Sequence, residues 1–184
     1  MVAKIKMKQL FPLLAMPVLA ALYSYSTVAR AETAEAGAVQ ISRGKYLVQF
    51  GSCTDCHTPG YRFGKPDSTR FLGGSDVGMR VSGLGTFVPP NLTPDKETGL
   101  GAWTKEQIIT AIQTGVTPSG RVLAPVMPWH AYAGLTKSDA GAIVDYLKTL
   151  PPVNNQVPGP FGPDEKPPIY TITLMPPDNT TQHN

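Results

Sequence analysis

Both cysteines of this chain and one of its three histidines lie within five residues, at Cys53, Cys56 and His57 in the stretch GSCTDCHTPG. Any fold must therefore present these three side chains together. Four chemistries share the pattern: a disulfide, a thiol redox pair, half of a zinc site, and covalent attachment of a prosthetic group.

Three of these chemistries fit the rest of the chain poorly. A disulfide between Cys53 and Cys56 would close a loop with two residues inside it, and so short a loop restrains the unfolded chain little. A redox pair expects a βαβ surrounding, and the chain shows no such alternation of strands and helices. Zinc takes four ligands, but His130 and His183 are far apart and unpaired. Adjacent Cys56 and His57 are also awkward as ligands of one small ion.

The fourth chemistry fits best, because C-x-x-C-H is the attachment signal of a c-type haem. On a helical turn Cys53, Cys56 and His57 sit at i, i+3 and i+4 and project from one face. Two thioether bonds can then form at the haem vinyl groups while the imidazole reaches the iron from the same side. Since the motif occurs once, it predicts one covalent haem c.

The N-terminus predicts export. The first eight residues hold three lysines and no acid, an apolar run follows over residues 10–22, and an A-x-A pattern ends at Ala31. This order is typical of a signal peptide cut after Ala31. The prediction is a signal peptide at 1–31, a main domain at 32–150 and a tail at 151–184. A run of 13 residues is short for a membrane span, so an uncleaved N-terminal anchor is the alternative.

The charge of the mature chain follows from that cleavage. Removing residues 1–31 takes away four basic and no acidic residues, which leaves 12 basic and 13 acidic residues and a formal charge of −1. A nearly neutral protein has no global basic field to attract nucleic acid or anionic lipid. We therefore expect a periplasmic protein with no nucleic-acid partner, whose membrane contact is indirect or through an uncleaved N-terminus.

Three segments are predicted to be helical. Residues 40–50 carry an apolar stripe that includes Gly44. Glycine in a helix costs about 1 kcal/mol relative to alanine, so it indicates either close packing or a tolerated position near the helix start. Thr104 opens a capping box for a short helix. Thr136 caps a helix from about Lys137 to Leu150, which a pair of prolines stops.

Two segments lack helical periodicity. The stretch 58–90 contains seven glycines and predicts loops with a short hairpin. The tail holds nine prolines in 34 residues and cannot continue a helical fold. Within it YTITL (Tyr170–Leu174) alternates like a strand. It predicts either a strap on the protein's own surface or a docking segment that adds a strand to a partner.

Met127 is the candidate for the second axial ligand. It lies between Pro125 and Pro128, whose fixed φ angles stiffen the loop. A neutral thioether favours ferrous iron and blocks the site against oxygen or peroxide. The alternatives are a core methionine that fills a gap, or His130 as the ligand. Met79 is a weaker candidate for the ligand, because it falls in the glycine-rich stretch, too early in the chain.

Together these segments resemble class I cytochromes c, over roughly Gln40 to Leu150. The resemblance implies an all-α fold with three to five helices around one covalently bound haem. It implies that the first and last helices cross with a small residue against an aromatic one, here Gly44 and Tyr146 with Ile143 nearby. It also implies an axial methionine just before the last helix, at Met127.

The remaining pocket residues follow from the same resemblance. His57 should donate its second ring N–H to a carbonyl, which the resemblance assigns to Pro90, and Leu92 would line the haem. Trp103 is the candidate for the propionates. Indole and guanidinium N–H groups donate to carboxylates, so further candidates are Tyr61, Arg62, Arg70 and Arg80.

Three stretches are more specifically similar to the cytochrome c subunits of periplasmic membrane-bound dehydrogenases: PPNLTPDKETGLGAWT, MPWHAYAGLT and IVDYLKTLPPV. Those subunits often contain several haem domains, whereas this chain has one motif. The resemblance implies an electron-transfer protein, not an enzyme, and the single motif predicts that it is monohaem. A periplasmic dehydrogenase would supply its electrons, and another cytochrome or an oxidase pathway would accept them. The alternative is a haem enzyme or gas sensor with a displaceable sixth ligand.

Overall fold

The structure, a computed structural model, describes residues 11–174. Residues 1–10 of the predicted signal peptide and residues 175–184 of the predicted tail, with Met175 and His183, lie outside the described residues. The chain divides into two units, Met1–Val39 and Gln40–Asn184. Among the residues described, no helix is both long and apolar enough to cross a membrane.

Helix α1 (Phe11–Phe50) begins well before the helix expected from residue 40. The alanine- and glutamate-rich residues 31–38 favour a helix, which accounts for part of this extension. In the first unit α1 is the only described element. Cleavage after Ala31 stays a prediction.

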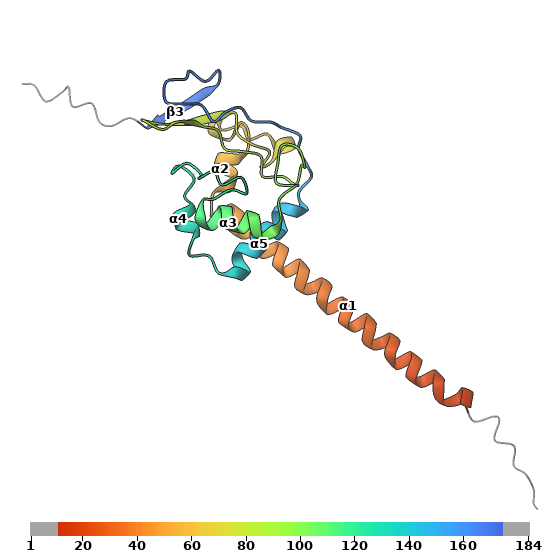
Figure 1. The fold of residues 1–184 in the computed structure, drawn as a ribbon. Helices are drawn as coiled ribbons and strands as arrows, with labels where there is room; N and C mark the ends of the chain where they lie inside the picture. The colour runs from red at the N-terminus through yellow and green to blue at the C-terminus, as the bar shows by residue number, and fades with distance from the viewer. Residues whose placement is uncertain (1–10, 175–184) are drawn as a thin grey trace, which may run out of the picture. The chain divides into compact units, whose positions relative to one another are not determined.

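The second unit contains the end of α1 and all other elements (Figure 1). After α1 they are α2 (Cys53–His57), the 3-10 turns η1 (Tyr61–Phe63) and η2 (Ser68–Arg70), β1 (Val77–Val81), β2 (Gly85–Phe87), α3 (Lys105–Thr114), α4 (Trp129–Tyr132), α5 (Lys137–Thr149) and β3 (Tyr170–Leu174).

Helices α3 and α5 begin at the two threonine caps that the sequence predicts. The Thr104 hydroxyl accepts the Gln107 N–H at 3.2 Å, and the Gln107 side chain accepts the Thr104 N–H at 2.8 Å. The Thr136 hydroxyl accepts the Asp139 N–H at 3.0 Å. Helix α3 ends at Gly115, whose φ of 72° suits glycine. Both predicted helices are therefore confirmed.

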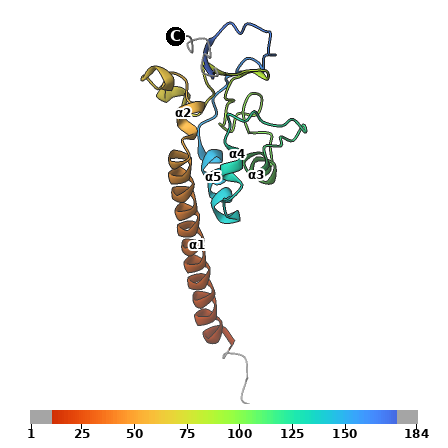
Figure 2. The same ribbon diagram turned by 90° about the vertical axis from the view of Figure 1, so that its left-hand side faces the viewer.

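The end of α1 packs against α5 at Gly44 (Figure 2). A Cβ atom added to Gly44 would overlap the carbonyl oxygen of Ala142 and lie 2.8 Å from the Cβ of Tyr146. The close packing predicted for Gly44 and Tyr146 is confirmed. Around this crossing the buried apolar residues form one cluster: Val48, Leu72, Leu100, Ile108, Ile143, Val144, Tyr146 and Leu147.

Replacing Gly44 by alanine is expected to destabilise the protein by about 1–3 kcal/mol, because overpacking outweighs the gain in helix propensity. Gly37→Ala is the matched control, since nothing lies within 4 Å of a Cβ at that position. The control should leave the free energy of unfolding unchanged or raise it by up to about 1 kcal/mol. Denaturant titration of both variants checks this, and equal stability of the two would contradict the packing.

The fold also contains a three-stranded sheet of order β2-β1-β3, so the expectation of an all-α fold was incomplete. Strands β1 and β2 form the hairpin predicted in the glycine-rich stretch. Strand β3, the YTITL segment, pairs in parallel with β1, with Val77 opposite Tyr170 (Figure 1). The tail thus packs on the surface of its own unit, which is the first of the two roles predicted for it. The other edge of the hairpin is covered at Thr86, which forms an isolated antiparallel bridge with Phe161.

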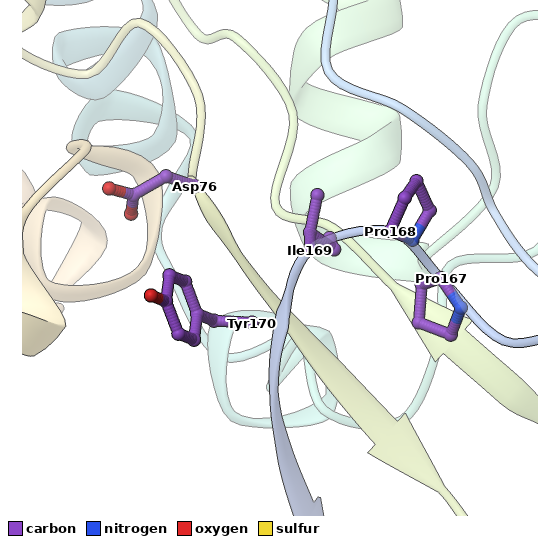
Figure 3. A pocket seen from close by; sticks show the side chains of 5 residues that line it. All are labelled: Asp76, Pro167, Pro168, Ile169 and Tyr170. Atoms are coloured by element: carbon purple, nitrogen blue, oxygen red, sulfur yellow. The ribbon is translucent and has the colours of Figure 1, made fainter.

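The tail also meets the segment that follows α2. A shallow hollow there is lined by Asp76 and by the tail residues 167–170 (Figure 3). The Asp76 carboxylate accepts the Gly60 N–H at 3.0 Å. The Phe63 ring meets the Tyr170 ring edge-on at 5.2 Å between centroids. The ring contact places Tyr170 of the tail beside the loop that follows the cysteine motif.

Candidate haem-attachment site

A sharp turn delivers the cysteine motif to the unit. The Gly51 N–H donates to the Leu47 carbonyl at 2.8 Å at the end of α1. Ser52 then adopts the left-handed conformation, with φ 55°, and α2 begins at the next residue. Helix α2 is a single turn of five residues that carries Cys53, Cys56 and His57. The spacing expected for one helical face is therefore present.

The His57 imidazole is buried, with 5% of the residue exposed. Its Nδ1 lies 2.6 Å from the carbonyl oxygen of Pro90, which can only accept a hydrogen bond. Burial lowers the pKa of His57 to about 4, against a smaller raising effect of the Pro90 bond. At neutral pH the ring is therefore uncharged with its proton on Nδ1. This leaves the Nε2 lone pair free to bind a metal.

The two cysteines are free thiols and half-buried. Burial raises the pKa of Cys53 to about 11. The Arg62 guanidinium donates to Cys56 Sγ at 3.1 Å. A redox-active dithiol needs a lowered pKa, so the environment of Cys53 argues against that chemistry. Within the described part of the chain, no group of three or more His, Cys, Asp or Glu side chains is placed to hold a metal ion.

Tyr132 ties α4 to the start of the motif. Its hydroxyl donates to the Gly51 carbonyl at 2.6 Å. The pKa of Tyr132 is raised to about 12, first by burial and then by the charges that Cys53 and Cys56 would carry as thiolates. Tyr132 follows Met127 by five residues. The loop that carries Met127 is therefore followed closely by a residue that bonds to the backbone just before the motif.

Met127 itself is half-buried and lies in a stiff turn. Its N–H donates to the Ala124 carbonyl at 2.9 Å, and its carbonyl accepts the Trp129 N–H at 2.8 Å. The Trp129 ring lies over Gly115, since a Cβ there would be 2.7 Å from the indole. His130 is exposed and stacks on Trp129, with 3.4 Å between ring centroids. The role of Met127 as a ligand stays a proposal.

Leu92 and Trp103 are partly buried and pack against the central cluster, as does Cys53. The Trp103 loop is fastened to α5 by Lys148, whose Nζ donates to the carbonyls of Leu100 at 2.8 Å and Trp103 at 2.9 Å. The structure therefore gathers Leu92, Trp103 and the motif around one core.

The other propionate candidates are not brought together. Arg70 forms an ion pair with Asp67 at 2.8 Å. Arg80 donates to the tail carbonyls of Pro163 at 2.6 Å and Glu165 at 3.2 Å. These local partners account for both side chains. Tyr61 is 39% exposed on η1, and Arg62 lies at the sulfur of Cys56.

No role for Tyr132, Lys148 or Asn91 was evident from the sequence. All three stand within the stretches that resemble dehydrogenase cytochrome subunits, but a contact made across the fold leaves no spacing to recognise. Lys148 lies among apolar residues at the end of α5, where a lysine usually remains solvated.

These residues fit a covalently bound haem. Two thiols and a neutral imidazole share one turn, the tautomer of the imidazole is fixed by a carbonyl, and apolar side chains surround them. The arrangement is the one expected for attachment of a c-type haem, and it makes the α2 turn the candidate site.

Residues 41–151 match the cytochrome c family, and the chain belongs to that family. The fructose dehydrogenase cytochrome subunit of Gluconobacter japonicus is 37% identical over 128 residues, which cover 66% of this chain and 24% of that protein. The gluconate 2-dehydrogenase cytochrome c subunit of Pantoea cypripedii is 34% identical over 107 residues, 58% of this chain and 22% of that protein.

A diheme cytochrome c-type protein of Cereibacter sphaeroides is 31% identical over 113 residues, which cover 61% of this chain and 37% of that protein. The chain thus spans less than a quarter of the fructose and gluconate dehydrogenase subunits named above, and somewhat more of the diheme protein.

Proposed function

We propose that this chain is a monohaem c-type cytochrome that transfers single electrons as the acceptor subunit or partner of a periplasmic dehydrogenase. The observation that carries the proposal is the α2 turn, where Cys53 and Cys56 stand beside a buried, neutral His57 whose Nδ1 is held by Pro90. Membership of the cytochrome c family supports electron transfer as the activity.

In this proposal each residue has a distinct task. Cys53 and Cys56 would hold the haem through thioether bonds. His57 and Met127 would bind the iron. Pro90, Leu92 and Trp103 would complete the pocket. A haem held in this way would supply one-electron chemistry through the change between ferrous and ferric iron.

The chain's own side chains set the conditions of that exchange. The Pro90 carbonyl fixes the ring orientation of His57 and strengthens it as a donor. The thioether of Met127 would favour the ferrous state. The buried cluster against which Cys53 packs would limit the access of water to the haem. The protein does not need to move a proton or break a bond of a substrate. Its task is to hold the haem and to set its reduction potential.

The names of the relatives support a dehydrogenase as the electron donor. The proposed acceptor is another cytochrome or an oxidase pathway. Residues 1–31 would direct the chain to the periplasm, where c-type haem is attached.

The test is to produce the full chain in a bacterial host that attaches haem in its periplasm. We expect a red protein with one covalent haem per chain, no spectral change when CO is added to the reduced form, and co-purification with a dehydrogenase subunit from its own host. A colourless protein would overturn the haem assignment. Ready CO binding would favour a gas sensor or haem enzyme. Reduction of the holoprotein by a purified dehydrogenase and its substrate would support the partner.

A further inference from the structure

The chain beyond α5 runs back along the loop that links β2 to α3, residues 88–104, here called the Pro90 loop. Residues 151–157, here called the strap, contact this loop and the glycine pair that precedes β1. The family match ends at residue 151, so the strap lies almost wholly outside it. The hydrogen bonds of the strap show what it holds in place.

Asn91 is the junction between the strap and the Pro90 loop. It is 1% exposed. Its side-chain Nδ2 donates to the Val153 carbonyl at 2.6 Å and to the Thr98 hydroxyl at 3.0 Å. Its Oδ1 accepts from the Thr93 N–H at 2.9 Å and the Thr93 hydroxyl at 2.7 Å. Both donors and the acceptor of the amide are therefore satisfied in a buried site.

Val153 makes the connection reciprocal. Its N–H donates to the Thr93 hydroxyl at 3.1 Å, while its carbonyl accepts from Asn91. A second strap residue, Asn155, donates from its backbone N–H to the Thr98 hydroxyl at 3.0 Å. The strap thus runs beside the Pro90 loop, and its backbone bonds to side chains of the loop rather than to the loop backbone.

The position of the Pro90 carbonyl depends on these anchors. Pro89 and Pro90 have no N–H with which to fix themselves. The loop is held on one side by the Ser75 N–H, which donates to the Pro89 carbonyl at 2.9 Å. On the other side it is held by Asn91 and by the Leu92 N–H, which donates to the Leu72 carbonyl at 2.9 Å.

The strap also contacts the glycine pair Gly73 and Gly74, and Gly74 in turn bonds to the backbone of His57. The Asn155 side chain donates to the Gly73 carbonyl at 2.7 Å. The next residue, Gly74, donates its N–H to the His57 carbonyl at 2.9 Å. A Cβ on Gly74 would lie 2.5 Å from Val157 of the strap. The strap is therefore in contact with both segments that hold His57.

We infer that Asn91 is a positioning residue, which uses the strap to hold the Pro90 carbonyl against His57 Nδ1 and thereby tunes the potential of the haem that His57 would bind. The inference rests on the proposed function. A carbonyl held at the ring N–H makes the imidazole a stronger donor and stabilises ferric iron. When the anchor is lost, the donor weakens and the potential rises.

The experiment uses the full chain loaded with haem. Asn91→Ala removes all four side-chain bonds. Thr93→Val is the milder variant, because it removes the hydroxyl bonds to Asn91 and Val153 but keeps the shape and the backbone N–H. We expect Asn91→Ala to move the one-electron equilibrium about tenfold toward the ferrous state, a rise of about 59 mV. Thr93→Val should shift it in the same direction by less.

Proton exchange gives a second readout that follows the hydrogen bond directly. In the reduced holoprotein, NMR should show faster solvent exchange of the His57 Nδ1–H in both variants than in the parent. A role for Asn91 in stability alone would change the unfolding midpoint and leave the potential and this exchange rate where they were.

Asn154→Ala is the matched control. Asn154 stands in the same strap, but its exposed amide donates to the Glu97 carboxylate at 3.1 Å and does not bond to Asn91 or Thr93. It should leave the potential and the Nδ1–H exchange unchanged. The inference is overturned if haem-loaded Thr93→Val and Asn91→Ala match the parent in both the potential and the rate of Nδ1–H exchange. A parent chain that binds no covalent haem would instead refute the proposed function.

Discussion

Replacing both Cys53 and Cys56 by alanine should yield a protein with no covalently bound haem. Each cysteine supplies one thioether bond in the proposed site, and the chain has no other cysteine to take over. Haem staining of the denatured protein, together with the intact mass, measures the loss. The single variants should each keep one bond and attach haem in reduced yield.

The loss of haem should also destabilise the fold. A ligand that binds only the native state stabilises it by mass action, and the buried His57 would lose the partner of its Nε2. Thr54→Ala is the control on the same turn, because its hydroxyl reaches only the neighbouring Asp55, at 3.1 Å. That variant should be red with a full haem content. If the double cysteine variant still carried covalent haem, the attachment site would be wrong.

Replacing Met127 should change the spectrum and the potential without removing the haem. Met127→Ala is expected to lose the far-red Met-to-iron band of the oxidised protein and to bind CO when reduced. Met127→His should lower the potential, because a second imidazole favours ferric iron more than a thioether does. A shift of at least about 59 mV corresponds to a tenfold change in the one-electron equilibrium.

Met79→Leu is the control for this prediction, since Met79 is a partly buried residue of β1 and leucine replaces methionine at little cost. Its far-red band should match that of the parent. Survival of the band in Met127→Ala would exclude Met127 as the ligand. Loss of the band in Met127→Ala together with its retention in His130→Ala would exclude the stacked, exposed His130.

Local signals in the sequence predicted local structure well. The capping residues Thr104 and Thr136 predicted where α3 and α5 begin, because a cap bonds to backbone only three residues away. Gly44 indicated close packing of its helix against another element, because the cost of glycine inside a helix needs a compensating contact. The C-x-x-C-H spacing predicted which three side chains would share a turn.

Contacts that join distant segments were not predictable in the same way. The YTITL alternation indicated a strand but not its partner, since pairing with β1 depends on how the whole chain folds back. Helix α4 is four residues long, too short to show a helical period. Arg80 looked like a candidate for propionates, yet it holds the tail, because a guanidinium binds whatever carbonyls the fold brings to it.

The parallel pairing of β1 with β3 has a consequence for the order of folding. Strand β1 ends at Val81 and β3 begins at Tyr170, and β2, α3, α4 and α5 lie between them in the chain. Pairings between residues so far apart in sequence form slowly, since the intervening chain must first be ordered. In the proposed export, β3 would emerge after every other described element, whereas the cysteine motif would emerge early. Haem attachment would then precede closure of the sheet, which would complete the unit around the proposed haem.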